Sequence, residues 1–287
     1  MVKGSRTRTL TEEGKQLLRW HLKPSAWAHD QLNWTLYDYQ AQDVDQYARN
    51  QMWLWGRQTG KSTSDAVLAL HQAVLYGGSL VLILSASLRQ SSELFRKVVE
   101  MYHRLKNAPR RIDDSSSLMT LANGSRIICL PGSEGTVRGY SAPELVILDE
   151  AAQCPDALYH AIRPMLLTSR GKLVLSSSAF AKIGFFWEIY RDRRNLPEWY
   201  IHEVTVAQCP NVDQQKLDED MRAMGRAVFD REYNNVFMAL AGGLFSDEDI
   251  AALRQSASDK YDISAWNLPK VGQGGSDAWK QGMVVRL

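Results

Sequence analysis

One short stretch constrains the fold of this chain more than any other. Residues 55–63 read Trp-Gly-Arg-Gln-Thr-Gly-Lys-Ser-Thr; an apolar run precedes them and a helix-like segment begins near Asp65. A strand, a tight loop and a helix in this order give the context that a phosphate-binding loop needs. The backbone N–H groups of such a loop point toward phosphate oxygens, and the helix N-terminus adds partial positive charge. The sequence therefore predicts a site for nucleotide phosphates here.

The residues of this loop suggest separate roles. Lys61 is expected to reach the β- and γ-phosphates of a nucleotide, and Ser62 to bind Mg²⁺. One feature departs from the common pattern, because the first glycine of Gly-x-x-x-x-Gly-Lys-Ser is replaced by Trp55. The residues expected to contact the nucleotide in this loop are Arg57, Gln58, Thr59, Gly60, Lys61, Ser62 and Thr63.

A second motif lies downstream, where an apolar run ends in two acids. Residues 145–150 read Leu-Val-Ile-Leu-Asp-Glu, which fits a strand buried on both faces, as in a parallel sheet. Asp149 is a candidate Mg²⁺ ligand, and Glu150 a candidate base that deprotonates the attacking water. The same pattern also fits a strand with a solvated acidic end. Combined with the phosphate loop, it favours hydrolysis of a nucleotide.

The remaining pattern alternates strands with helices. Apolar runs at 80–85 and 172–176 predict buried strands, 117–121 and 126–130 predict a hairpin, and 212–234 predicts one long helix. This order predicts an α/β fold of the P-loop NTPase class, ASCE or RecA-like. We expect an open, mostly parallel sheet with helices on both faces and a small helical lid region.

Charge is uneven along the chain although its net value is only +2. Residues 1–23 hold six Lys or Arg against two Glu, and residues 89–111 hold seven against two. Basic stretches of this kind either contact nucleic-acid phosphates or form solvated helix faces. No apolar run approaches transmembrane length, so no membrane partner is expected.

With these motifs together, the chain resembles the ATPase domain of the large terminase subunit, the DNA-packaging motor of tailed bacteriophages. One feature that supports the resemblance is the loop itself, since Arg-Gln-x-Gly-Lys-Ser without the leading glycine is typical of that family. Another is the pair Tyr39 and Gln40, which is similar to the family's adenine-contacting segment. A glutamine amide can pair with the edge of adenine. Gln40 could also be an ordinary residue at a helix start.

Two further grounds lie near the acidic strand. The resemblance implies that Arg138 is a finger inserted into a neighbouring subunit's site, where a permanent cation stabilises charge on the phosphoryl group. Arg57 is the rival for this role, and either arginine could instead be structural. The serines Ser176, Ser177 and Ser178 resemble the family's coupling motif, which senses the γ-phosphate. They also fit a simple serine-rich strand end.

The resemblance covers residues 35–245 and divides the chain into three parts. Residues 1–34 are expected to form a basic N-terminal arm, 35–245 the ATPase domain, and 246–287 a linker or tail. Large terminases usually carry a second, nuclease domain. A tail of about 40 residues is too short for such a core, so nuclease activity is not predicted in this chain.

The expected function is that of an ATP-hydrolysing motor that moves double-stranded viral DNA into a procapsid. The resemblance implies ATP and Mg²⁺ as cofactors, DNA bound without sequence preference, a homo-oligomeric ring, a small terminase subunit and a portal protein. The implied location is the host cytoplasm. Two alternatives remain open: the first lobe of a superfamily-2-like helicase, and a nucleotide-gated DNA-binding or assembly protein with little turnover.

Overall fold

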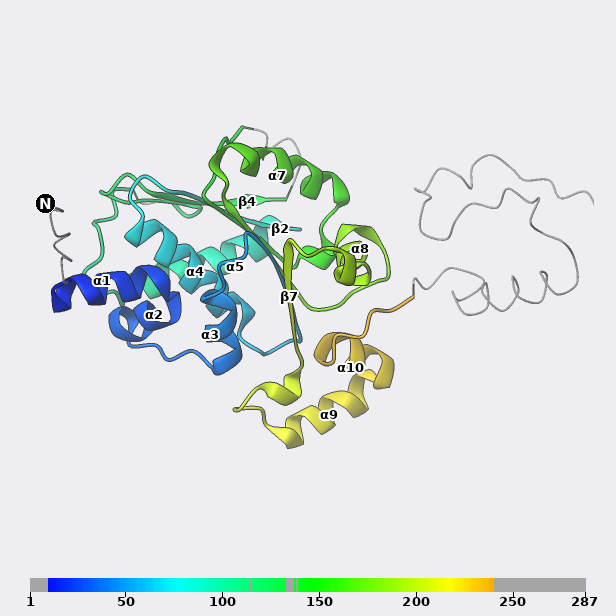
Figure 1. Ribbon diagram of the computed structural model, residues 1–287. Helices are drawn as coiled ribbons and strands as arrows, with labels where there is room; N and C mark the ends of the chain where they lie inside the picture. Colours follow the sequence, from blue (N-terminus) through cyan, green and yellow to red (C-terminus); the bar gives the residue numbers. More distant parts are fainter. Residues whose placement is uncertain (1–9, 114, 133–136, 138, 240–287) are drawn as a thin grey trace, which may run out of the picture. The chain divides into compact units, whose positions relative to one another are not determined.

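A seven-stranded sheet forms the centre of the molecule, with the strand order β3-β4-β2-β5-β6-β1-β7. The computed structural model describes residues 10–113, 115–132, 137 and 139–239. Figure 1 shows the strands side by side, with helices above and below them. The strands are β1 (Asn50–Trp55), β2 (Leu80–Ser85), β3 (Leu118–Thr120), β4 (Arg126–Pro131), β5 (Leu145–Asp149), β6 (Lys172–Ser177) and β7 (Trp199–Val204).

The sheet is parallel except at one edge. Strands β4, β2, β5, β6, β1 and β7 pair in parallel, whereas β3 and β4 form an antiparallel hairpin close to the predicted one. In the register, Asp149 of β5 lies beside Ser176 of β6, and Ser176 lies beside Trp53 of β1. The predicted α/β class and mostly parallel sheet are confirmed, and the motif-bearing strands are neighbours.

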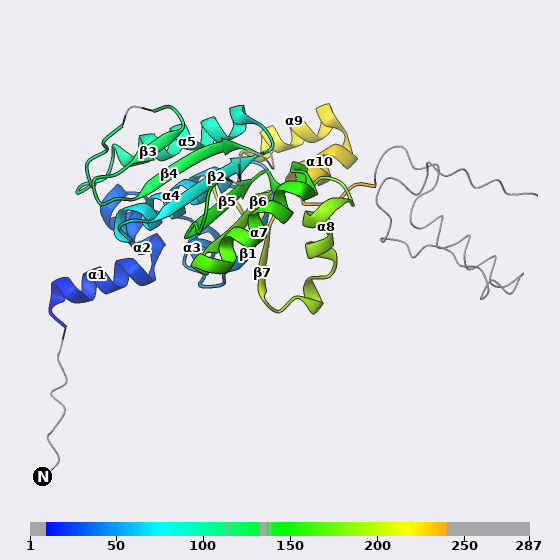
Figure 2. The ribbon, with the colours of Figure 1, turned by 90° about the horizontal axis from the view of Figure 1, so that it is seen from above.

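Helices cover both faces of this sheet. Figures 1 and 2 show α7 on the opposite face from α4 and α5, with α2 and α3 beside α4. The α-helices are α1 (Glu12–Leu22), α2 (Pro24–Leu32), α3 (Asp38–Val44), α4 (Lys61–Leu75), α5 (Leu88–Tyr102), α7 (Asp156–Ser169), α8 (Gly184–Arg191), α9 (Gln214–Met224) and α10 (Arg226–Tyr233).

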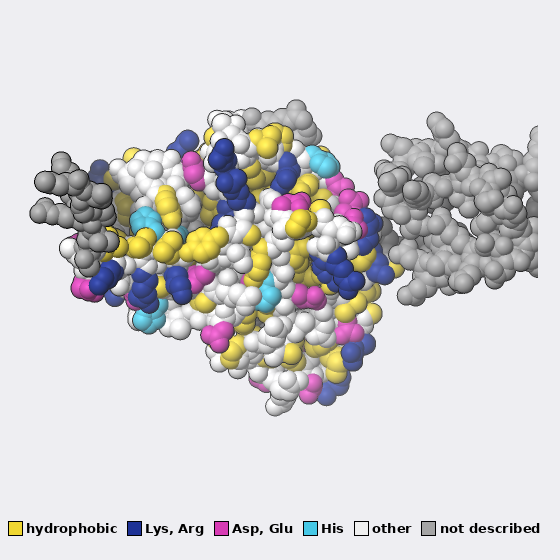
Figure 3. All heavy atoms as spheres, in the orientation of Figure 1, with side chains coloured by type: hydrophobic (Ala, Val, Ile, Leu, Met, Phe, Trp, Pro, Cys, Tyr) yellow, Lys and Arg dark blue, Asp and Glu magenta, His cyan; other side chains and the backbone are white. Residues whose placement is uncertain are grey.

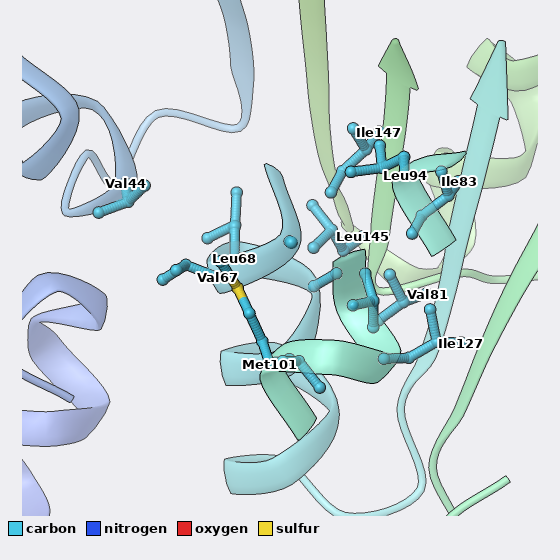
Figure 4. Close-up of a cluster of buried hydrophobic side chains, with 14 of the residues drawn as sticks. Val44, Val67, Leu68, Val81, Ile83, Leu94, Met101, Ile127, Leu145 and Ile147 are labelled. Carbon is cyan, nitrogen blue, oxygen red and sulfur yellow. The ribbon is translucent and has the colours of Figure 1, made fainter. Parts of the chain in front are cut away.

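Strand periodicity explains the two layers. Successive side chains of a strand point to opposite faces, so Trp53 and Trp55 join one core while Met52 and Leu54 join the other. All four are fully buried. Figure 4 shows the first core, where Val67 and Leu68 of α4 pack near Ile147 of β5. Burial on both faces is why these strands read as continuous apolar runs.

The predicted long helix at 212–234 is wrong, because the structure has two helices there. Between α9 and α10, Gly225 adopts a φ of 77°, which is left-handed backbone that cannot continue an α-helix. The two helices share a small apolar cluster with Leu217 and Phe229. They form the small helical lid region.

The segment before residue 34 is more than a basic extension. Helix α2 inserts Trp27, Ala28 and Leu32 into the first core, whereas α1 has no buried residue. Within the described part of the chain, no helix is both long and apolar enough to span a bilayer.

A buried histidine ties α4 to the N-terminal helices. Nε2 of His71 lies 2.8 Å from the carbonyl oxygen of Trp20, and its ring packs edge-on against Trp27. The side chain is 4% exposed. Burial disfavours the charged imidazolium and lowers the pKa of His71 to about 4.

We predict that this histidine makes stability fall as the pH is lowered. The pKa of a histidine is 6.5 in the unfolded chain and about 4 for folded His71. Between these two pH values the unfolded chain binds a proton at this residue and the folded chain does not. This costs on the order of 3 kcal/mol of unfolding free energy by the bottom of that window. The stabilisation is complete above pH 6.5. Urea denaturation across this range should show a smaller loss for His71→Gln than for the unsubstituted protein. His160→Gln, a change at an exposed histidine, should follow the unsubstituted protein.

Candidate functional site

The loop between β1 and α4 is bent by two residues with left-handed backbone. Gln58 has a φ of 64° and Gly60 a φ of 85°. A Cβ on Gly60 would also meet Nε2 of Gln40, and its positive φ favours glycine. Helix α4 begins at Lys61, and Thr59 closes the loop by donating from Oγ1 to the carbonyl of Gly56 at 2.7 Å. This is the concave backbone of an anion-binding loop.

The tryptophan at the start of the motif belongs to the strand. Trp55 is the last residue of β1 and is fully buried, stacked on Trp53 with ring centroids 5.5 Å apart. Its Nε1 donates to buried Asp43 at 3.0 Å, and Asp43 also accepts from Tyr200 at 2.7 Å. The loop therefore starts at Gly56, one residue later than the common motif places its first glycine.

Gly56 has its own steric reason to be glycine. A Cβ there would lie 2.5 Å from the carbonyl oxygen of Tyr233, at the end of α10. The next backbone N–H, of Arg57, donates to the carbonyl of Glu232 at 2.7 Å. The side chains of Arg57 and Glu232 also form an ion pair. The lid region thus rests directly on the phosphate loop.

Lys61 is held inside the loop. Its Nζ donates to the carbonyls of Trp55 at 2.9 Å and Gly56 at 3.4 Å. Burial lowers the pKa of Lys61, while the charges of Glu150 and Asp149 raise it. The acidic pair is therefore close enough to act on the lysine across the ends of the strands.

The two acids of the pair differ in surroundings. Asp149 is buried, and burial together with the charge of Glu150 raises its pKa to about 7. Its Oδ1 accepts from the N–H of Glu150 at 3.0 Å. Glu150 is half-buried, has a left-handed φ of 51°, and accepts from Oγ of Ser177 at 3.5 Å. One carboxylate is thus enclosed and the other reaches the cavity.

The serine-rich end of β6 contacts a carboxylate that sequence reasoning missed. Oγ of Ser176 donates to Oδ2 of Asp65 at 3.0 Å. Asp65 is fully buried in α4, and its Oδ1 has no hydrogen bond within the described residues. Burial and the charge of Asp149 raise the pKa of Asp65. Its spacing of one helical turn from Lys61 was the available signal, because such residues share a helix face.

A cavity of about 580 Å³ opens on the lid side of the loop. Gln40, Gln58, Gly60 and Thr63 line it, as do three aromatic residues that the sequence analysis did not select, Trp34, Tyr37 and Tyr233. Aromatic faces beside polar groups suit a flat heterocyclic ring.

The predicted adenine-contacting pair is placed beside this cavity. Tyr39 is buried under the loop and donates from its hydroxyl to the carbonyl of Thr59 at 2.8 Å. Gln40 approaches the loop carbonyls with its Nε2, 3.3 Å from that of Gly60, and accepts from the N–H of Tyr37 at 2.9 Å. Gln40 lines the cavity, whereas Tyr39 supports the loop from below.

A second cavity of about 560 Å³ lies on the acidic side of the loop. Ser62, Asp149 and Glu150 line it together, with residues from the start and middle of α5. A serine hydroxyl and two carboxylates are oxygen ligands of the kind that Mg²⁺ prefers. The structure thus brings Lys61, Ser62 and the acidic pair together.

Only one of the two candidate arginines, Arg57, lies within the described residues. Arg57 lies beside the loop and is largely exposed, with its ion pair to Glu232. Arg138 lies outside the described residues. Ser178 is buried at the end of β6, next to Ser177.

The family model described as "Terminase large subunit, ATPase domain" matches residues 33–190, more than half of the chain. Comparison with curated proteins gives no match.

Solved structures of phage proteins share the fold. The large terminase ATPase domain of Thermus phage P74-26 is 20% identical with a TM-score of 0.64, covering 76% of this chain and 100% of that one. The HK97 bacteriophage large terminase is 17% identical with a TM-score of 0.52, covering 80% of this chain and 49% of that one. A large terminase from a thermophilic bacteriophage, solved in complex with ADP, is 12% identical with a TM-score of 0.57, covering 78% and 53%. This chain spans about half the length of the latter two proteins.

We predict that the bond between β6 and α4 contributes to stability. Ser176→Ala removes the hydroxyl that donates to buried Asp65, which should lower the unfolding free energy by about 1–3 kcal/mol. Ser178→Ala is the matched control, because Ser178 is also buried but its hydroxyl makes no hydrogen bond within the described residues, so its loss should lower the unfolding free energy less than Ser176→Ala does. Equal midpoints in urea denaturation for the two variants would contradict the assignment.

Proposed function

Because the chain belongs to the family of terminase large subunit ATPase domains, we propose that it binds ATP with Mg²⁺, hydrolyses it to ADP and phosphate, and uses the cycle to move double-stranded viral DNA into a procapsid. One observation carries the hydrolytic part of the proposal. Ser62, Asp149 and Glu150 line one cavity, and the charges of both acids act on Lys61 of the loop.

The two cavities support a placement for the nucleotide. The adenine ring fits the cavity of Trp34 and Tyr37, with the amide of Gln40 at its polar edge. The phosphates then lie on the loop, with the last of them toward Ser62 and the acidic pair. Such a nucleotide replaces the loop carbonyls as the partner of the Lys61 ammonium group.

The donor set fits a magnesium ion. Mg²⁺ is usually held by one or two protein oxygens plus phosphates and water, and the Ser62 hydroxyl and the Asp149 carboxylate can supply the protein oxygens. When bound, the ion neutralises charge that develops on the phosphates. Binding it favours the ionised form of Asp149, whose pKa is otherwise raised by burial.

Glu150 is the residue we assign as base. It is half-buried at the cavity wall, and the nearby hydroxyl of Ser177 helps to orient its carboxylate. A base in this position takes a proton from water as the water attacks the terminal phosphorus atom. Lys61 stays protonated and stabilises the phosphate oxygens.

Arg57 and Arg138 are the two candidates for an arginine that completes the site. Arg57 would have to leave Glu232 to reach a phosphate. Arg138 follows from the family resemblance and is our preferred finger, supplied by the next subunit of a ring. Its planar, permanent cation suits a phosphoryl group.

Two sets of contacts can transmit a conformational change from the site to other parts of the chain. The hydroxyl of Ser176 in β6 bonds to Asp65 in α4. Release of phosphate from the loop at the start of α4 can therefore shift the end of β6. Gly56 and Arg57 touch the end of α10, so a change in loop shape can move the lid. Ser177 and Ser178 at the same strand end complete the proposed sensor of the γ-phosphate.

The proposed partners follow from the family. We propose that residues 35–245 form the ATPase domain, that the basic N-terminal arm of residues 1–34 is joined to its core through α2, and that 246–287 form a linker or tail. We propose further that the chain acts in a homo-oligomeric ring with a small terminase subunit and a portal protein in the host cytoplasm. DNA would be held by its phosphates without base readout. Lys and Arg form several separate groups on the face seen in Figure 3, with Asp and Glu among them.

The decisive test is hydrolysis by the purified chain with and without duplex DNA. Glu150→Gln keeps the size of the side chain and removes the base, so turnover should fall by about 100-fold or more while ATPγS binding persists. The measurements are phosphate release and equilibrium binding. Wild-type turnover in the Glu150→Gln protein would sink the proposal, and strand separation driven by ATP would favour a helicase instead.

A mixing experiment tests the arginine. Arg138→Ala alone and Glu150→Gln alone should both be nearly inactive. A mixture should regain turnover, because each subunit then supplies the group that its neighbour lacks. Phosphate release is measured against the mixing ratio. Full activity of Arg138→Ala would shift the role to Arg57, which Arg57→Ala then tests.

A further inference from the structure

The basic helix α5 presents its charges in two different surroundings. Arg96 is exposed and pairs with Glu93 at 2.7 Å. Its neighbour Lys97 is half-buried and lines the 560 Å³ cavity together with Asp149 and Glu150. The stretch that reads as uniformly basic in the sequence therefore contains one lysine turned to the acidic side of the phosphate loop.

The position of Lys97 is fixed by the packing of its helix. Leu94 and Val98, on either side of it along α5, are buried in the first core, and Figure 4 shows Leu94 beside the sheet residues Ile83 and Ile147. The lysine stem therefore starts from an anchored backbone beside this cavity, which the side chain lines.

The ammonium group of Lys97 has no hydrogen bond or ion pair within the described residues. It lines the same cavity as Ser62, Asp149 and Glu150. The three N–H donors of an ammonium group that no described side chain engages can bind a further anion in that cavity. The nucleotide assigned to this cavity supplies such an anion in its terminal phosphate.

Arg89 is the other cation that lines the cavity. It is exposed in the first turn of α5, where solvent screens its charge. Lys97 is less exposed and lines the cavity from the middle of α5, between helix positions that are buried in the core. Lys97 is therefore the stronger candidate for contact with a phosphate oxygen.

We propose that Lys97 is a catalytic residue that contacts the terminal phosphate of ATP from helix α5, while Lys61 contacts the phosphates from α4. This inference rests on the proposed ATPase function and adds a second cation from the same chain to it. A fixed cation near the phosphoryl group stabilises charge as the bond to ADP breaks. Its contact exists with ATP and is lost once the terminal phosphate has gone.

The test compares Lys97→Met with Arg96→Met. Both changes remove one positive charge from neighbouring positions of α5, but of the two residues only Lys97 lines the cavity. We expect Lys97→Met to lower kcat by about tenfold or more, as loss of an electrostatic donor does. Arg96→Met should stay within about twofold of the unsubstituted chain, since its ion pair is exposed.

The ratio of the ATPγS and ADP dissociation constants distinguishes a phosphate contact from a purely structural role, which would not change this ratio. The dissociation constants of Mg²⁺·ATPγS and Mg²⁺·ADP are measured for each full-length variant. If Lys97 contacts the terminal phosphate, Lys97→Met weakens ATPγS binding about tenfold and leaves ADP binding nearly unchanged. Lys97→Arg should retain much of the preference for ATPγS.

Three results would overturn the inference alone, and a fourth would overturn it together with the proposed function. One is a kcat for Lys97→Met equal to that of Arg96→Met while Glu150→Gln is inactive; the ATPase assignment then stands and the role of Lys97 does not. Another is equal weakening of ATPγS and ADP binding, which means that Lys97 only balances the acidic pair. The third is a selective loss in Arg89→Met instead. Absence of turnover in the unsubstituted chain, with and without DNA, overturns the proposed function and this inference with it.

Discussion

The site depends on the parallel pairing of β1, β6 and β5. Parallel strands end at the same edge of a sheet, so the loop after β1, the serines of β6 and the acidic pair after β5 must meet there. The pairing also sets the register that places Asp149 beside Ser176. A slip of one residue would turn both side chains to the other face, and the aligned cores would be lost with them.

The site also depends on electrostatic interactions among its buried charged side chains. Lys61, Asp65 and Asp149 are buried; the charges of both acids raise the pKa of Lys61, and the charge of Lys61 lowers the pKa of each acid. Buried charges are costly unless they are paired, and the cation and phosphate that we propose for this site would balance them. The same argument explains why a half-buried lysine of α5 faces the acids. The fold positions these charged side chains, and we propose that the ligand balances their charges.

The sequence predicted the strands, the loop and the acidic pair because each is a local pattern. An apolar run next to Gly and Lys residues, or ahead of two acids, can be read without knowing its neighbours. The break at Gly225 was missed because a helical pattern of charges continues across it. Trp34, Tyr37 and Asp65 were missed because their importance comes from contacts with segments far away in the chain.

The sequence by itself determined the fold class, and it predicted Lys61, Asp149 and Glu150 as members of a nucleotide site, since periodicity and spacing can be read directly from it. Only the tertiary structure decided why Trp55 stands where glycine is common, which cations face the acids, and what the loop rests on. The reason is physical: a side chain's charge and burial depend on the elements packed around it. Those elements, such as α5 and α10 around the loop of β1, are brought together only by folding.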